Sequence, residues 1–267
     1  MHRFATAILG AALLAGCAVP QRLSDERIAA IVASPDRSSA DRALDARRKP
    51  AELLTFIGIQ PGMTALDVSA GRGYTAELIA RAVGPTGKVY AQTAPRDASR
   101  APPAQPEGAA APAPPSSIVT PPPPALVERA RNPLTANIVP VMRRLDDPVP
   151  PEVANGGLDL VTLVFNYHDL GHMGIDRARM NHAIFTALRR GGMFVLADHS
   201  GRSGTGISEA GTLHRVEEAF VVTEVEAAGF RLAASGNFMR NPVDPRDRNT
   251  PEPPMPKDEF VLKFVKP

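Results

Sequence analysis

The sequence predicts one α/β domain with a doubly wound, mostly parallel β-sheet, and three observations carry this prediction. Short apolar runs alternate with helix-like segments from about residue 51 to the end of the chain, which is the pattern of parallel βαβ units. The run at residues 158–165 is almost continuously apolar, as in a central strand buried on both faces. At residues 63–83 a strand ends in a glycine-rich turn that starts a helix.

The individual elements follow from length, periodicity and turn residues. Strands are predicted at residues 63–68, 88–91, 137–142, 158–165, 193–197, 230–235 and 259–265. Helices are predicted at residues 24–33, 51–59, 74–83, 125–131, 177–188 and 213–228. The last two strands are expected to pair, so that the sheet has an antiparallel C-terminal edge strand.

We divide the chain into three parts. Residues 1–17 form an export signal, residues 18–49 a helical or linker segment, and residues 50–267 the α/β domain. Within the second part, residues 38–49 are highly charged and predict a solvated helix or a linker. Residues 94–124 are dominated by Ala, Pro and Ser, so we expect an extended insertion in the domain rather than packed structure.

The first residues resemble a bacterial lipoprotein signal. A short basic start is followed by an apolar run over residues 4–15, and Leu14-Ala15-Gly16-Cys17 matches a lipobox. Cys17 is the only cysteine in the chain, and it stands where lipid attachment requires it. We expect lipidation of Cys17 and a location on the periplasmic side of the outer membrane. The alternatives are a plain signal peptide cleaved near Ala18, which gives a soluble periplasmic protein, or a buried apolar helix.

Composition weighs against some classes of partner. The net charge is +2, aromatic residues make up 5% of the chain, and tryptophan is absent. These values favour neither nucleic acid nor an anionic membrane surface, so membrane association is expected through the N-terminal lipid only.

The strongest local signal is the stretch from Leu66 to Tyr74, Leu-Asp-Val-Ser-Ala-Gly-Arg-Gly-Tyr. Gly71 and Gly73 allow the backbone to approach a ligand closely, and the helix that follows presents free N–H groups. It resembles the first motif of class I S-adenosylmethionine (SAM) methyltransferases, Asp/Glu-x-Gly-x-Gly-x-Gly. The segments at residues 59–63 and 83–89 extend the resemblance, which covers most of the chain after Pro50.

The resemblance implies a Rossmann-like fold with SAM as its cofactor. By position, Asp67, Ser69, Gly71 and Gly73 would line the cofactor site, with Ser69 in place of the motif's first glycine. Where the family has an acidic residue for the ribose hydroxyls, this chain has Ala91-Gln92-Thr93, and Gln92 would accept one hydrogen bond.

The carboxyl ends of two further strands extend this implied site. Asp147, or its neighbour Asp146, resembles the residue that holds the adenine amino group. Asn166 follows the fourth strand and completes the implied cofactor set.

Polar residues follow the fourth and fifth strands, at the carboxyl edge of the predicted sheet, which we call the rim. They form the segments Asn166-Tyr167-His168-Asp169-Leu170-Gly171-His172 and Asp198-His199-Ser200, with His214-Arg215 opening the next helix. We favour acid/base catalysis, with His168 as base, Tyr167 and Asp169 orienting it, and His199 as a second candidate. A metal site of His168, His199 and His214 or Asp198 is an alternative, as is capping of helices; the favoured interpretation includes no metal.

The leading functional hypothesis is a SAM-dependent methyltransferase acting on a small or lipophilic acceptor. Because SAM is a cytoplasmic metabolite, the export signal supports an alternative: a non-enzymatic lipoprotein that uses the cofactor cleft for another small molecule. A metal-dependent, hydrolase-like protein is a third hypothesis and rests on the histidines.

Overall fold

The computed structural model describes residues 22–95, 122–249 and 255–267. The predicted export signal with Cys17 lies outside these residues, as does the predicted Pro-rich insertion except for its two ends. Within the described ranges, no helix has the length and apolar character needed to cross a membrane.

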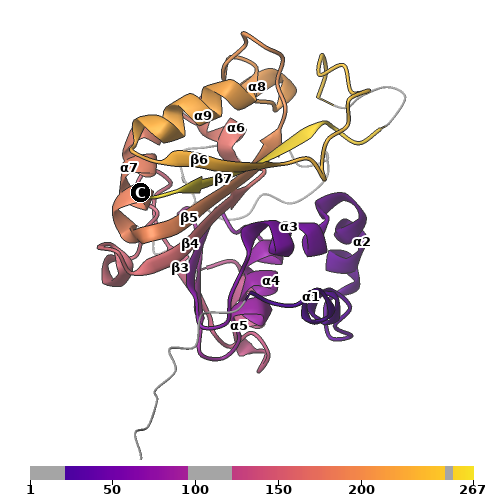
Figure 1. Ribbon diagram of the computed structural model, residues 1–267, viewed down its shortest axis with the longest axis vertical. Helices are drawn as coiled ribbons and strands as arrows, with labels where there is room; N and C mark the ends of the chain where they lie inside the picture. The colour runs from indigo at the N-terminus through magenta and orange to yellow at the C-terminus, as the bar shows by residue number, and fades with distance from the viewer. Residues whose placement is uncertain (1–21, 96–121, 250–254) are drawn as a thin grey trace, which may run out of the picture.

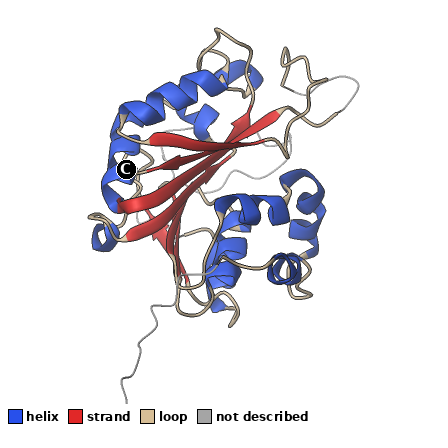
Figure 2. Ribbon diagram, viewed as in Figure 1, coloured by secondary structure: helices blue, strands red, loops and turns tan. Residues whose placement is uncertain are grey.

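Seven strands of the described chain form one sheet in the order β3-β2-β1-β4-β5-β7-β6 (Figures 1 and 2). The strands are β1 Thr64–Val68, β2 Lys88–Thr93, β3 Ile138–Met142, β4 Leu158–Val164, β5 Leu188–His199, β6 Arg231–Gly236 and β7 Glu259–Val265. β7 pairs antiparallel with both β5 and β6, and the other pairs are parallel. The predicted fold is confirmed, with the antiparallel C-terminal strand one position in from the edge, which β6 forms.

Helices cover both faces of this sheet (Figure 1). They are α1 Asp25–Val32, α2 Ser39–Arg48, α3 Pro50–Ile57, α4 Tyr74–Val83, α5 Pro124–Arg131, α6 Tyr167–His172, α7 Arg177–Ala187, α8 Ala210–Leu213 and α9 Glu218–Ala227, with a 3-10 turn at Pro151–Val153. One core lies under α1, α3 and α4, and a second core lies under α6, α7 and α9. β4 contributes side chains to both cores. Leu160 and Val164 face the first core, and Val161 and Leu163 face the second.

The predicted helix at residues 213–228 is wrong at its start. The structure has two helices there, α8 and α9, and His214 between them has a left-handed backbone with φ 50°. Arg215 is fully buried and donates to both oxygens of Asp244, at 2.8 and 3.1 Å, and to the Ser200 carbonyl at 3.0 Å. This buried ion pair explains the break, since a continuous helix would turn Arg215 away from Asp244.

The order of the strands creates the crevice in which a ligand site is expected. β1 pairs with both β2 and β4, so the crossover connections leave β1 and β4 in opposite directions. In such sheets ligands bind outside the carboxyl ends of the strands, at this switch point. Asp67, near the end of β1, and Asn166, just after β4, therefore lie on the same side of the molecule.

Candidate functional site

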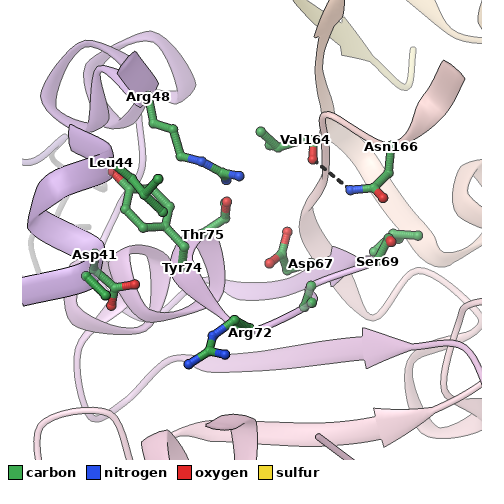
Figure 3. Close-up of a pocket in the computed structure, with 14 residues that line it drawn as sticks. Asp41, Leu44, Arg48, Asp67, Ser69, Arg72, Tyr74, Thr75, Val164 and Asn166 are labelled. Atoms are coloured by element: carbon green, nitrogen blue, oxygen red, sulfur yellow. Dashed lines mark hydrogen bonds between the residues drawn. The ribbon is translucent and has the colours of Figure 1, made fainter. Parts of the chain in front are cut away.

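A cavity of about 410 Å³ lies at the carboxyl ends of β1 and β4, beneath α2 (Figure 3). Such a volume suits a small organic molecule, since pockets of this kind measure about 300–1,000 Å³. The lining residues come from α2, β1, the glycine turn, α4 and the end of β4: Ala40, Asp41, Leu44, Arg48, Asp67, Val68, Ser69, Ala70, Gly71, Arg72, Tyr74, Thr75, Val164 and Asn166.

The glycine turn has the backbone that its sequence requires. Gly71 and Gly73 have φ of 55° and 86°, where residues with a Cβ are strained. A Cβ on Gly73 would lie 2.5 Å from Leu126 Cδ2, so the bare glycine also allows α5 to pack against the turn. Of the sequence-predicted cofactor residues, Asp67, Ser69, Gly71 and Asn166 line the cavity, whereas Gly73 is the N-cap of α4.

Gln92 does not point into the cavity. Its side chain is fully buried, with Oε1 accepting from the Ser69 N–H at 2.8 Å and Nε2 donating to the Arg143 carbonyl at 2.6 Å. Ser69 has φ 55°, an unusual value for a serine, and the Gln92 carbonyl also accepts from the Ala70 N–H at 2.8 Å. The residue expected to bind ribose therefore holds the turn in shape.

Asp67 is buried with half of its carboxylate unpaired. Oδ1 accepts a hydrogen bond from Thr162 Oγ1 at 2.7 Å, while Oδ2 has no hydrogen-bond partner among the described residues. Burial raises the pKa of Asp67 to about 7, against the opposing effects of the Thr162 hydrogen bond, the Arg48 charge and the Ala76 N–H. An unsatisfied carboxylate oxygen next to a cavity is suited to a cationic or hydrogen-bond-donating ligand group.

Arg48 brings a positive charge to the same cavity from the end of α2 (Figure 3). Its guanidinium carbon lies 5.0 Å from the ring centre of Tyr74 and 5.2 Å from that of Phe165. Its Nε is buried without a hydrogen-bond partner in the described chain, and burial lowers the pKa of Arg48. The cavity thus combines a buried carboxyl group and a half-buried guanidinium.

Helix α2 is fixed over the cavity by charged contacts. Asp45 accepts from Arg37 at 2.7 and 2.8 Å and from the Tyr74 hydroxyl at 2.6 Å, and Asp41 accepts from Arg129 at 2.7 Å. The sequence predicts a solvated helix or a linker at residues 38–49; the structure has a helix there, and one of its faces lines the cavity.

The acidic residues after β3 make local ion pairs. Arg144 holds both oxygens of Asp146, at 2.8 Å each, and Arg143 holds Asp147. Neither carboxylate lines the cavity between β1 and β4. The residues that the resemblance assigns to adenine are therefore engaged with arginines in this structure.

The histidines predicted at the rim come together around Asp169. His168 Nδ1 lies 2.6 Å from Asp198 Oδ1, and His168 Nε2 lies 3.2 Å from Asp169 Oδ1. Burial alone would lower the pKa of His168, but hydrogen bonds to the two carboxylates outweigh it and raise the pKa to about 9. Both ring nitrogens of His168 face carboxylates, so in the base role that the sequence suggested Nε2 would have to turn from Asp169 toward a substrate.

Tyr167 points away from that group, and His199 lies beside His168, with ring centres 5.3 Å apart, without contacting Asp169. The Tyr167 hydroxyl is buried in the second core, where it donates to Glu224 Oε2 at 2.8 Å, so it does not orient His168. His199 stacks on Phe165 with ring centres 5.1 Å apart, and burial lowers the pKa of His199. Its Nδ1 lies 3.0 Å from Glu259 Oε1, but the angle between the two groups is not that of a hydrogen bond.

Phe165 links the two parts of the site. It has φ 61°, a strained value for a bulky residue, and its ring lies between His199 and the guanidinium groups of Arg47 and Arg48. Backbone strain of this kind concentrates at functional sites. No local pattern in the sequence marks Arg48 or Phe165, because tertiary packing alone gives them their positions.

Comparison with known proteins supports this architecture. Residues 24–94 match the family model of protein-L-isoaspartate(D-aspartate) O-methyltransferase, a stretch that runs from α1 to the end of β2. No curated protein sequence matches the chain.

Solved structures of similar fold extend over more of the chain. A SAM-dependent methyltransferase from Aquifex aeolicus is 16% identical with a TM-score of 0.53, over 92% of this chain and 100% of the other. An arsenic(III) S-adenosylmethionine methyltransferase from Chlamydomonas reinhardtii is 15% identical with a TM-score of 0.51, over 90% of this chain and 73% of the other. The chain therefore has the Rossmann-like fold of the class I SAM-dependent methyltransferases.

Proposed function

We propose that this protein binds SAM in the cavity under α2 and transfers its methyl group to a small or lipophilic acceptor. The observation that carries the proposal is the pair of acidic and basic side chains at the cavity, the buried Asp67 from β1 and the half-buried Arg48 from α2. SAM ends in an amino-acid head group with an ammonium and a carboxylate. A cavity with a carboxyl group and a guanidinium is complementary to that head group.

The residues present fit this ligand. Asp67 Oδ2 is a buried acceptor without a partner in the described chain, and an ammonium would supply the missing donor. Arg48 would hold the carboxylate, and the turn from Ser69 to Gly71 lets the backbone lie against the ligand. When bound, SAM supplies a methyl group on a sulfonium, which a nucleophilic O, N, S or C atom can take.

The acceptor would enter from the rim between β4 and β5. Asn166 lines the cavity there, and Phe165 and His199 form a stacked pair beside it. The chain would position the acceptor, while α2 excludes water from the cleft. The stacked rings and the absence of a strong net charge favour a small or lipophilic acceptor over a nucleic acid.

The comparisons support the proposal in two ways. The family match over residues 24–94 includes α2, β1, the glycine turn and the start of α4, which together make most of the cavity. The structures of similar fold include proteins whose names describe them as SAM-dependent methyltransferases.

Calorimetric titration with two ligands tests the proposal. SAM and 5′-methylthioadenosine share the adenosine and the sulfur, but the second lacks the amino-acid head group and the sulfonium charge. We expect saturable binding of SAM, and weaker binding of 5′-methylthioadenosine by about 10-fold or more, since charge-assisted hydrogen bonds contribute about 1.5–3 kcal/mol.

A substitution then locates the head group. Arg48→Gln should weaken the binding of SAM by about 10-fold, which corresponds to about 1.4 kcal/mol. The affinity for 5′-methylthioadenosine should stay unchanged. Arg42→Gln is the matched control, because Arg42 lies on the same helix and does not line the cavity. Absence of saturable SAM binding below millimolar concentration would refute the proposed function. An equal loss of affinity for both ligands in Arg48→Gln would refute the assigned role of Arg48.

A further inference from the structure

Three side-chain atoms with lone pairs converge beside the rim, outside the cavity. His168 Nε2 is 3.2 Å and His214 Nδ1 is 3.3 Å from the same oxygen, Asp169 Oδ1, and one ligating atom from each of the three residues lies within 4.8 Å of the others. His172 stands next to them, with Nδ1 4.0 Å from that oxygen. Two imidazoles, a carboxylate and a third imidazole nearby form a donor set that transition metals prefer.

The orientation of His168 is fixed from behind. Asp198 is fully buried, and its two oxygens accept hydrogen bonds from the backbone N–H groups of His168 and His199, at 2.8 Å each. Held in this way, Asp198 accepts from His168 Nδ1 at 2.6 Å, which directs Nε2 toward Asp169. A carboxylate that holds the far nitrogen of a histidine is the usual support of a metal-binding imidazole.

Close backbone packing brings the second histidine to the first. α6 packs against α8, and a Cβ on Gly171 would lie 2.6 Å from Ile207 Cγ1, so only glycine allows this approach without a shift. His214 follows α8 with φ 50°, a left-handed conformation that is uncommon for residues other than glycine. Side-chain exposures of 42% for His214 and 30% for Asp169 leave the group open to solvent on one side.

We infer that His168, Asp169 and His214 bind a divalent transition metal of the zinc type, with one coordination position open to solvent or to His172. Two of the three ligand–ligand distances fit tetrahedral coordination, because ligands about 2.0–2.1 Å from zinc lie about 3.3 Å apart along the edge of a tetrahedron. The distances of 3.2 and 3.3 Å from Asp169 Oδ1 equal that edge closely. This set differs from the metal alternative that the sequence suggested, since His199 lies outside it and Asp198 supports it from behind.

An ion pair alone does not account for the arrangement. One imidazole would satisfy Asp169, and His168 already stands beside it. His214 and His172 add two more imidazoles, whose rings meet edge to face at 5.9 Å. A metal ion would use the nitrogens of several of these rings at once. This inference is independent of SAM binding.

Metal binding by the full-length, metal-free protein tests the site directly. Titration with Zn²⁺, followed by dialysis and elemental analysis, should give one ion held by the cluster. Titration with Co²⁺ should give the visible absorption of tetrahedral cobalt without the thiolate band that ligation by Cys17 would produce.

Two variants and one control decide the assignment. His214→Asn removes an imidazole while its side chain tolerates the left-handed backbone, and Asp169→Asn removes the carboxylate charge. Each should weaken Zn²⁺ binding by at least 10-fold, with thermal unfolding measured to show that the variant is folded. His182→Ala removes an exposed histidine on α7 and should bind Zn²⁺ as the parent does.

Three results would overturn the inference. They are Zn²⁺ binding that is unchanged in both folded variants, an octahedral cobalt spectrum, or a loss in His182→Ala equal to that in His214→Asn. Any of these would mean that the histidines take metal only as separate surface groups.

Discussion

Asp67 makes stability depend on pH, because its carboxyl is buried and half unpaired. Its pKa is about 7 in the folded protein, whereas an aspartate in an unfolded chain has a pKa of about 3.9. Below about pH 4 the group is protonated in both the folded and the unfolded state, so it does not change the free energy of unfolding. As the pH rises to about 7 the unfolded state ionises first, so the free energy of unfolding falls by a few kcal/mol and then stays level.

Asp67→Asn should remove this dependence. The difference in free energy of unfolding, variant minus parent, should increase between pH 4 and pH 7 and be constant above pH 7. Urea denaturation at four pH values measures it, and a difference that does not change with pH would contradict the prediction. Because the amide of this variant lacks the charge that attracts an ammonium, the variant should also bind SAM about 10-fold more weakly, in line with the loss of a charge-assisted hydrogen bond.

Gln92 shows how position in the sequence can mislead about a single residue. Its place at the end of the second strand suggested a ribose contact, yet both polar atoms of its side chain bind backbone groups. Gln92→Leu would leave the Ser69 N–H and the Arg143 carbonyl without these partners, which should cost about 2–4 kcal/mol in free energy of unfolding.

Denaturant unfolding of Gln92→Leu, with Gln60→Leu as a half-buried control, measures that cost. A loss no greater than that of the control would mean that the Ser69 turn does not depend on Gln92. In that case water or a relaxed backbone would satisfy the two groups.

At the scale of elements, polar side-chain contacts hold α2 over the cleft, and the Tyr74 hydroxyl on Asp45 is one of them. Tyr74→Phe should destabilise the docked helix by about 1 kcal/mol, the net value of a hydrogen bond. Amide hydrogen exchange should then become several-fold faster in α2 and stay unchanged in α7, which packs in the second core. Equal acceleration in both helices would indicate global destabilisation instead.

Packing of α6 against α8 gives a second prediction at this scale. Gly171→Ala places a Cβ against Ile207 and Ala210, so we expect a loss of about 1–3 kcal/mol and a weaker Zn²⁺ site, because the two helices must separate. Gly174→Ala is the control: it also strains a backbone with φ 66°, but its Cβ would meet open space. If both variants keep the same Zn²⁺ affinity, the close approach of α6 and α8 is not needed for the site.

The elements themselves are predictable where local pattern decides them. Apolar runs, turn glycines and helical spacing are enough for all seven strands of the described sheet and for α4, α5 and α7. The pattern fails between α8 and α9, because the burial of Arg215 against Asp244 is a tertiary effect that no local spacing reveals. It also misses α6, since six residues are too few to show helical periodicity.

At the scale of the molecule, the candidate site is only partly predictable. The glycine turn and Asp67 follow from a contiguous motif, and the carboxyl edge follows from strand order. Arg48 does not, because α2 is distant in sequence and meets the cavity only after folding. The meeting of His168 and His214 at one rim follows from the strand ends, but the place of Asp169 between them does not. The catalytic role predicted for His168 rests on its position in the chain, and the flanking carboxylates of Asp169 and Asp198 change that interpretation.

The lipobox adds a prediction for the whole chain. Cys17 is the only thiol among the 267 residues, so no other cysteine can accept a lipid. We expect that cells fed an alkyne-labelled fatty acid will label the protein, and that Cys17→Ser will abolish the label and release the protein from the membrane fraction. Each buried CH₂ contributes about 0.8 kcal/mol, so several acyl chains would anchor the protein stably. Label retained in Cys17→Ser would contradict the assignment, and an unlabelled parent in the soluble fraction would favour a cleaved signal instead.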